Sequence, residues 1–284
     1  ILFELIKPPR IVRVSPTMVS SDVVSNLPVI IHGEGFPSTA DLSCMFDDTP
    51  AQATYISSAS VSCFPPLLGP GVVQLKLLAT DSNLTTKSLD FSYYVPIRVI
   101  RAKPAFGSLY GGTYVYVHGL NFQPTSAIRC RFDAIDVPSQ YLNTSCIACI
   151  SPAQENIGSV SLEVSLNGMD FTNDNVLFHY SEPSQVVSIK PSTGSINGGT
   201  KLYAHGTNFN SSGTFKCAFG GEIVTGEYVS SSVITCISPA GNVGAVSVEV
   251  TGNDADYTTN FIHFTYRLPV RLLSLYPLSG PESG

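Results

Sequence analysis

The sequence repeats itself with a period of about 86 residues, and this restricts the possible folds more than any other feature. The segment Val115–Phe122, which reads VYVHGLNF, recurs in related form at 29–36 and 202–209. The histidines of the three copies are 86 and 87 residues apart, and they are His32, His118 and His205. Internal similarity at a fixed step is the signature of a repeat array. We therefore expect three successive units, each large enough for its own small core.

The local pattern within each unit is typical of β-strands. In Val160–Val164, apolar and polar residues alternate, and the same alternation recurs in 73–77 and 246–250. Clusters of Gly, Pro, Asn and Asp separate such segments, and no stretch has a helical period. The sequence therefore predicts an all-β chain of three small sandwiches. Their expected ranges are residues 11–94, 95–181 and 182–266.

Both ends of the chain are out of phase with the three units. Residues 1–10 resemble the last strand of a preceding unit, because Phe3-Glu4-Leu5 parallels the closing Phe91-Ser92-Tyr93. Residues 267–284 resemble the first strand of a following unit, because 270–280 parallels the segment that starts at Val186. Two interpretations remain open. The chain is a window from a longer array, or the surplus strands pair with neighbouring chains by strand addition.

The cysteines indicate an oxidising compartment. Each unit holds two cysteines 19 residues apart, and the pairs are Cys44/Cys63, Cys130/Cys149 and Cys217/Cys236. Zinc sites use much closer pairs, and only Cys146-x-x-Cys149 has such spacing. One pair per small β-unit predicts three disulfides and an extracellular location. Each bond would contribute on the order of 3 kcal/mol to the stability of its unit.

Cys146 is the seventh cysteine and has no counterpart in the other units, which have Ser60 and Val233 there. It lies three residues before Cys149 on one expected strand, so the two side chains should face opposite ways. We therefore expect Cys146 to be an unpaired, outward-facing thiol. The alternative is a Cys130–Cys146 bond that leaves Cys149 free.

The remaining composition limits the classes of partner. Only 13% of residues are charged, the formal net charge is −6, and no basic stripe occurs, so nucleic acid is not an expected partner. No run of about 18 apolar residues occurs, which argues against a transmembrane segment here. Three Asn-x-Ser/Thr sequons predict N-linked glycans at Asn83, Asn143 and Asn210.

The order of landmarks in a unit resembles a known family. A Pro and a Gly at the first turn precede Gly-Gly-Thr, a β-branched strand, Gly-x-Asn-Phe, Cys-x-Phe, Cys-x-x-Pro and a closing Phe-x-Tyr. This order is similar to the IPT/TIG domain, the immunoglobulin-like fold of plexins, scatter-factor receptors and some transcription factors. The third unit carries the pattern at Pro191, Gly194, Gly198, Gly199, Thr200, Gly206, Asn208, Phe209, Cys217, Phe219, Cys236, Pro239, Phe264 and Tyr266. The first unit departs from it, with Ser25-Asn26-Leu27 in place of Gly-Gly-Thr and Gly35 in place of Asn.

Few residues are candidates for chemistry. His118 follows the inward-facing Val115 and Val117 and is expected at a strand end, where a structural role is favoured over a pH-sensitive contact or a metal site. Calcium ligands could be imagined at Asp170 and Asp174, or at Asp254 and Asp256, but these positions favour a turn. No nucleophile motif occurs, so we expect no catalytic residues, no metal and no cofactor.

These observations predict a non-enzymatic extracellular protein. The first hypothesis is a stiff, glycosylated rod of Ig-like repeats with a structural or adhesive role, such as a protomer of an extracellular filament, with copies of itself or neighbouring repeats as partners. The second is the stalk of a plexin-like receptor ectodomain, as the resemblance implies. A DNA-binding regulator is a third class, which the acidity and the expected disulfides disfavour.

Overall fold

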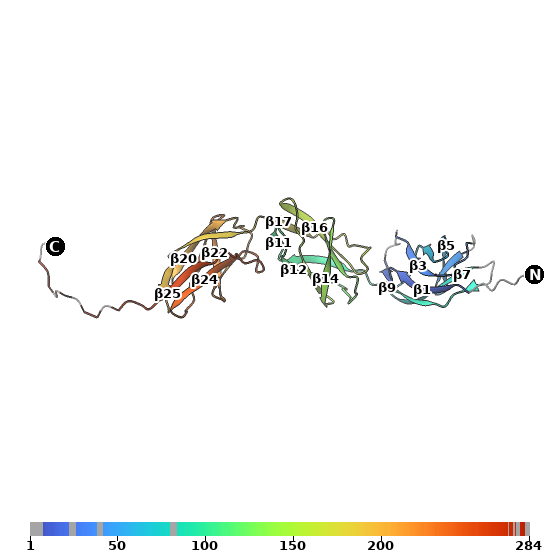
Figure 1. The fold of residues 1–284 in the computed structure, drawn as a ribbon, viewed down its shortest axis with the longest axis horizontal. Helices are drawn as coiled ribbons and strands as arrows, with labels where there is room; N and C mark the ends of the chain where they lie inside the picture. The colour runs from blue at the N-terminus through green and yellow to red at the C-terminus, as the bar shows by residue number, and fades with distance from the viewer. Residues whose placement is uncertain are drawn as a thin grey trace, which may run out of the picture. The chain divides into compact units, whose positions relative to one another are not determined.

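The computed structural model describes residues 8–22, 27–38, 42–79, 84–271, 273–274, 276 and 279–281, and it contains strands but no helix in these residues. The strands form three β-sandwiches (Figure 1). The expected all-β class with three tandem Ig-like units is confirmed.

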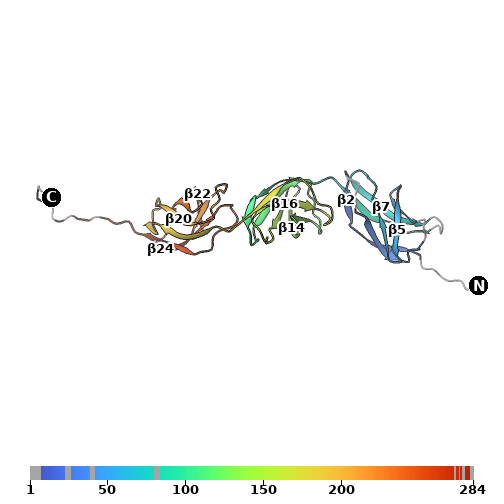
Figure 2. The ribbon, with the colours of Figure 1, turned by 90° about the horizontal axis from the view of Figure 1, so that it is seen from above.

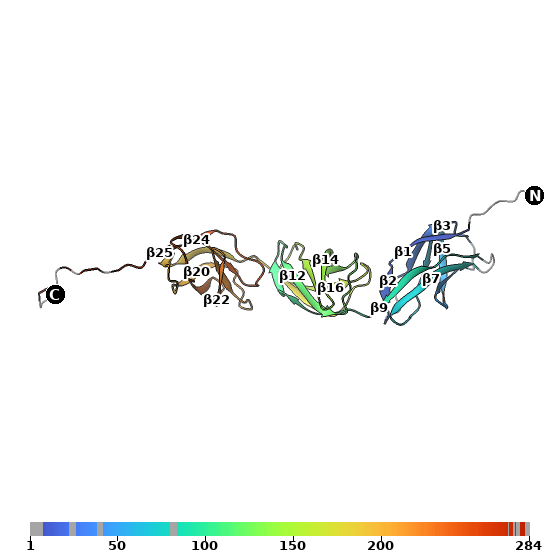
Figure 3. The same ribbon diagram turned by 90° about the horizontal axis from the view of Figure 1, so that it is seen from below.

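The first sandwich has nine strands. They are β1 (Arg10–Ser15), β2 (Met18–Ser20), β3 (Val29–Glu34), β4 (Leu42–Phe46), β5 (Thr49–Ser57), β6 (Ser60–Cys63), β7 (Gly71–Ala79), β8 (Leu84–Thr85) and β9 (Leu89–Tyr94). Their order is β1-β3-β6-β5-β4-β7-β9-β2, with β8 paired to β7. All pairs are antiparallel except β2 with β9. Figure 3 shows β1 and β3 on one side of this sandwich and β7 and β9 on the other.

The second and third sandwiches repeat this order with eight strands each. The second consists of β10 (Arg98–Lys103), β11 (Phe106–Ser108), β12 (Tyr114–Leu120), β13 (Arg129–Phe132), β14 (Ile135–Asn143), β15 (Cys146–Ile150), β16 (Gly158–Ser165) and β17 (Leu177–Ser181). The third consists of β18 (Gln185–Lys190), β19 (Thr193–Ser195), β20 (Lys201–Thr207), β21 (Lys216–Phe219), β22 (Glu222–Ser230), β23 (Val233–Ile237), β24 (Gly244–Thr251) and β25 (Ile262–Arg267). Figure 2 shows β20, β22 and β24 of the third sandwich from above.

One long strand in each sandwich passes from one layer to the other. In the first sandwich, β5 pairs through Ala51 with Cys44 of β4, and through Ala53 with Cys63 of β6. In a flat sheet, the two neighbours of one strand lie about 9–10 Å apart. The Cα atoms of Cys44 and Cys63 are only 6.4 Å apart, so the sheet folds sharply over β5 at this point.

The three disulfides close this fold. The structure pairs Cys44 with Cys63, Cys130 with Cys149 and Cys217 with Cys236. Each bond passes over the long middle strand, where the residue opposite the second cysteine is small: Ala53, Ser139 or Gly226. A Cβ on Gly226 would lie 3.3 Å from the Cys217 sulfur, which shows how little space remains there. The three disulfides therefore join the two layers of their sandwiches. Antibody domains also have a disulfide between their layers, but it links a different pair of strands.

The core of each sandwich is built from the inward-facing residues of the alternating strands. Val29 and Ile31 on β3 are fully buried, and so are the corresponding Val115 and Val117 on β12. Aromatic rings pack edge to face at the centre, with 5.3 Å between the ring centroids of Phe46 and Phe91. The second and third sandwiches repeat this pair as Phe132–Phe178 at 5.3 Å and Phe219–Phe264 at 5.6 Å.

In the described residues, each end segment contributes one residue to a strand of the three sandwiches: Arg10 begins β1, and Arg267 ends β25. Residues 1–7, which hold most of the expected last strand of a preceding unit, lie outside the described residues. In the expected first strand of a following unit, Arg267 still belongs to β25, and the described residues after it form no strand.

Candidate interface between successive repeats

A polar turn of the third sandwich is organised by one asparagine. The connection between β24 and β25 contains Asn253, which is 9% exposed. Its side-chain oxygen accepts hydrogen bonds from the backbone N–H of Ala255 at 3.1 Å and of Asp256 at 2.8 Å. Asparagine favours such turns because its short side chain can replace a backbone acceptor. The amide nitrogen of Asn253 therefore remains free to bond elsewhere.

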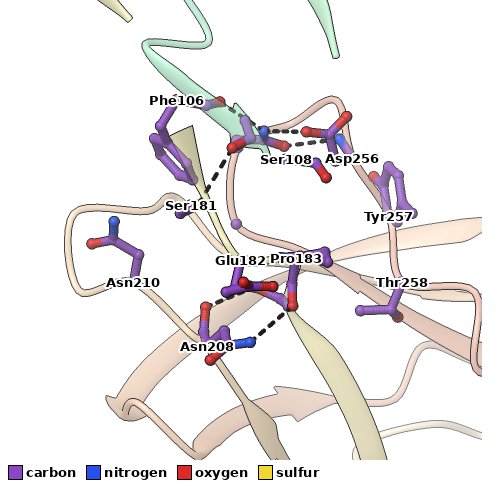
Figure 4. Close-up of a pocket in the computed structure, with 14 residues that line it drawn as sticks. Phe106, Ser108, Ser181, Glu182, Pro183, Asn208, Asn210, Asp256, Tyr257 and Thr258 are labelled. Atoms are coloured by element: carbon purple, nitrogen blue, oxygen red, sulfur yellow. Dashed lines mark hydrogen bonds between the residues drawn. The ribbon is translucent and has the colours of Figure 1, made fainter. Parts of the chain in front are cut away.

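That nitrogen reaches a strand of the second repeat. Asn253 Nδ2 donates to the carbonyl of Phe106 on β11 at 3.0 Å and to Asp256 Oδ2 at 2.8 Å. The same carboxylate oxygen accepts a hydrogen bond from the Thr113 hydroxyl at 2.8 Å. Although they come from two repeats, these residues pack within one compact body of the structure, which holds Phe106, Thr113, Asn253 and Asp256. Figure 4 shows Phe106, Ser108 and Asp256 at this contact.

The second repeat contains the same arrangement 86 residues earlier. Asn167 accepts hydrogen bonds from the backbone N–H of Met169 and Asp170, both at 2.9 Å. Its amide nitrogen donates to Asp170 Oδ2 at 2.9 Å and to the carbonyl of Met18 on β2 at 3.0 Å. Met18, Asn167 and Asp170 pack together within the other compact body of the structure. An Asn-x-x-Asp turn thus contacts the same short strand, β2 or β11, of the preceding repeat in both cases.

A second recurring asparagine holds the linker before the second and third repeats. Asn121 donates its side-chain amide to the carbonyl of Pro96 at 2.7 Å, and Asn208 donates to that of Pro183 at 3.1 Å. Both residues have φ near +62°, a left-handed conformation that Asn tolerates better than most residues. Gly35 has φ of +70° at the equivalent place, so glycine in the first repeat meets the same backbone requirement without the side-chain bond.

The cavity beside the Asn253 turn is too small for a typical ligand. It has a volume of about 60 Å³, and Figure 4 shows it between Ser181, Glu182, Asn208, Asn210 and Tyr257. Small-molecule sites usually measure about 300–1,000 Å³. This space has room for only a few water molecules. The arrangement can position two repeats against each other, but the cavity itself offers no space for a substrate.

Cys146 is unpaired, as expected, but the prediction that it faces solvent is wrong. The residue is 8% exposed. It lies on β15, a strand in the middle of its layer, opposite His118 of β12 and Asn143 of β14. Strands thus pair on both sides of β15, and the thiol is buried although it lies on the outer face. This burial raises the pKa of the Cys146 thiol.

The other candidate residues take structural positions. His118 is half-buried at the end of β12, where burial and then the nearby Arg101 and Lys103 hold its pKa below the usual value. Asp170 and Asp256 belong to the turns described above. Asp174 accepts a hydrogen bond from the backbone N–H of Val99 at 2.6 Å. Among the residues that the structure describes, no group of three or more His, Cys, Asp and Glu could hold a metal ion.

The sequons remain predictions. Asn143 accepts hydrogen bonds from both the backbone N–H and the hydroxyl of Ser145, at 2.9 and 2.8 Å, and its side chain is exposed. Asn210 accepts one from the backbone N–H of Ser212 at 3.0 Å. Asn83 lies outside the described residues.

The interface asparagines were not among the residues singled out from sequence. Asn167 and Asn253 lie in segments that the sequence marks as turns, and their partners Met18 and Phe106 are about 150 residues away. One signal was available, because Asn-x-x-Asp recurs at the repeat step of 86 residues.

Comparisons with known proteins give a consistent picture. The family model described as "IPT/TIG domain" matches residues 9–93, 98–180 and 184–266. Plexin-2 of Caenorhabditis briggsae is 26% identical over 201 residues, which cover 66% of this chain and 11% of that protein. Human fibrocystin-L is 30% identical over 186 residues, which cover 61% of this chain and 4% of that protein.

A solved structure of the plexin A4 full extracellular region is similar to this chain with a TM-score of 0.50 and 17% sequence identity. The match covers 91% of this chain and 24% of that one, and it supports the fold. This chain thus corresponds to a small part of the proteins that it resembles. The part that the structure describes contains no helix with the length and apolarity of a membrane span.

Proposed function

Because this chain belongs to the IPT/TIG domain family over all three of its repeats, we propose that it is a non-catalytic stalk segment of a plexin-like cell-surface receptor ectodomain. The observation that carries the proposal is the recurring Asn-x-x-Asp turn. Its polar atoms bond within the turn or to the preceding repeat, as expected of a segment that positions other domains. Plexin relatives and three disulfides support an extracellular place.

The partners that this proposal implies are the neighbouring repeats of the same chain. A filament protomer is the other structural candidate, and it needs a strand that one chain lends to the next. The plexin relatives favour the receptor stalk over that candidate. N-linked glycans at Asn83, Asn143 and Asn210 belong to the same proposal, since a secreted chain with these sequons passes the glycosylation machinery.

Secretion of the chain from animal cells tests the proposal. The 284-residue chain is fused to a cleavable signal peptide, and the medium is analysed by size exclusion with light scattering under non-reducing conditions. We expect a monomer whose mass falls on treatment with a glycan-releasing amidase. Large polymers would favour the filament instead. Retention in the cell as a reduced, aggregated chain would contradict an extracellular place.

A further inference from the structure

One face of the second sandwich differs in chemistry from its counterparts. Strands β10, β12, β15 and β14 lie side by side, and their registers define two rows of residues across the sheet. The first row is Lys103, Tyr116, Ala148 and Gln140, and the second is Arg101, His118, Cys146 and Asn143. The neighbours of Tyr116 on β12, Val115 and Val117, are fully buried. Because side chains alternate along a strand, both rows lie on the outer face.

Two exposed tyrosines pack edge to face on this side of the sheet. Tyr114 and Tyr116 are 38% and 44% exposed, and their ring centroids are 5.2 Å apart at an interplanar angle of 71°. The Tyr114 hydroxyl donates to Gln140 Oε1 at 3.2 Å. Since β15 lies between β12 and β14, the Tyr114 side chain must extend across β15 to make this bond. Tyr114 thus lies over β15, where its register partner is Ile150, and it remains exposed to solvent.

The charge beside these two tyrosines is positive. Arg101 and Lys103 on β10 are both exposed and flank His118 and Tyr116 in the sheet register. Both cations lower the pKa of His118, which shows that their charges act on this face. No acidic residue occurs in the two rows. The face is therefore locally basic in a chain whose formal net charge is −6.

The equivalent face of the third sandwich lacks this combination. Lys201 takes the place of Tyr114, and its ammonium lies 6.0 Å from the centroid of the Tyr203 ring, which corresponds to Tyr116. Glu227 takes the place of Gln140, and Ser188 takes the place of Arg101. A cation thus lies near the one remaining ring, and a carboxylate reduces the positive charge. The first sandwich has Ile30 and Ser15 where the second has Tyr116 and Lys103.

We propose that this face of the second sandwich binds a sulfated polysaccharide chain. The exposed ring surfaces of Tyr114 and Tyr116 match the apolar C–H face of a sugar ring, because both are flat and poorly hydrated. Arg101 and Lys103 supply charge-assisted hydrogen bonds to sulfate oxygens, as such side chains do for carboxylate and phosphate groups. An acidic peptide would use the cations but needs no exposed aromatic ring beside them, so the two exposed tyrosines favour a glycan.

Titration calorimetry with a heparin-derived octasaccharide tests this proposal on the secreted chain. Asn143 lies in one of the two rows, so a full glycan on it would cover this face. The glycans of the protein used in the experiment are therefore trimmed to the first sugar. The variant Arg101→Ser/Lys103→Ser should weaken binding at least tenfold, and Tyr114→Ser/Tyr116→Ser should weaken it several-fold. The matched control, Lys190→Ser/Lys201→Ser on the third sandwich, removes the same charge and should stay within twofold of the unmodified chain. Circular dichroism confirms folding of each variant.

Three results would overturn the proposal. The first is the absence of saturable binding to the unmodified chain at low salt. The second is an equal loss of affinity in the control and the Arg101/Lys103 variant, which would mean that net charge alone acts. The third is tighter binding of a poly-glutamate peptide than of the octasaccharide, which would assign the face to an acidic polypeptide. In support, desulfated octasaccharide should bind at least tenfold more weakly, and added salt should weaken binding of the sulfated form.

Discussion

The glycine after each repeated histidine lies where the backbone leaves no room for a side chain. A Cβ on Gly33 would overlap the carbonyl oxygen of Arg10 and the ring tip of Phe36. Gly119 and Gly206 have the same relation to Phe122 and Phe209. In each sandwich, the phenylalanine three residues later therefore packs directly over the glycine. This contact explains why the glycine and the phenylalanine recur in the repeated His-Gly-x-x-Phe pattern.

Replacing Gly33 with alanine should destabilise the first sandwich by at least about 2 kcal/mol, because the overlapping backbone of β1 cannot move without breaking its pairing with β3. Gly69 provides a matched control, since a Cβ there meets no heavy atom within 4 Å. Thermal unfolding of Gly33→Ala and Gly69→Ala measures the difference. Equal stability of the two variants would contradict the proposed overlap.

The thiol of Cys146 should react slowly in the folded chain, because it is buried and its pKa is raised. Titration with a thiol reagent under non-reducing conditions should find one reactive group per chain after unfolding in guanidinium, since the other six cysteines are paired. Rapid labelling of the native chain would mean that Cys146 is open to solvent. More than one thiol after unfolding would contradict the disulfide assignment.

His118 should make the second sandwich less stable in mild acid. Its pKa is lower in the fold than in the unfolded chain, where it is about 6.5. The unfolded chain therefore binds more protons in this range, so stability is complete above about pH 6.5 and declines as the pH falls toward the folded pKa. His118→Gln should flatten the decline between pH 7 and 5, as measured by urea unfolding. An unchanged slope in this variant would assign the pH dependence to other groups.

At the scale of elements, the turn between the last two strands links a repeat to its predecessor. In Asn253, the side-chain oxygen holds the turn and the side-chain nitrogen holds the Phe106 carbonyl. The side-chain oxygen thus acts only within the turn, whereas the nitrogen bonds both Asp256 in the turn and the Phe106 carbonyl. A substitution that keeps the oxygen and removes the donor can therefore separate the turn from the contact with the second repeat.

Asn253→Asp should keep the turn and lose the contact, because a carboxylate still accepts from Ala255 and Asp256 N–H but cannot donate to Phe106. It also places a negative charge beside the Asp256 carboxylate. Hydrogen exchange should then accelerate at the contact residues around Thr113 while the turn amides stay protected. Asn253→Ala, the comparison variant, should expose both regions. Protection of the Thr113 region in Asn253→Asp would show that Asn253 does not hold this contact.

The sequence allows the sandwiches to be predicted but not this contact. Alternation in Val160–Val164 and the 86-residue period directly report strands and units, because both patterns are local. The Asn253–Phe106 bond joins residues 147 positions apart, and no local pattern encodes it. Cys146 shows a second limit. Alternation correctly places it on the outer face, whereas its burial depends on the strands that pair on both sides of β15, which are β12 and β14.

At the scale of the whole chain, the first and third sandwiches have cores that share no residue. The core of the first is drawn from residues 11–93, and that of the third from 186–266. Their disulfides also lie within single repeats. Since cooperative unfolding requires shared contacts, a chain with separate cores need not unfold in one step. A single melting temperature would then not describe the molecule.

Removing one disulfide should therefore affect one transition only. In Cys217→Ala/Cys236→Ala, the third sandwich loses a bond worth about 3 kcal/mol, which for a domain of this size corresponds to a fall in melting temperature of roughly 10–20 °C. The transitions of the other repeats should move little, because their own bonds and cores are unchanged. Scanning calorimetry of the unmodified chain and this variant measures both effects. If all transitions moved down together, the repeats would unfold as one cooperative body, and the Asn-x-x-Asp contacts would couple them more strongly than separate cores imply.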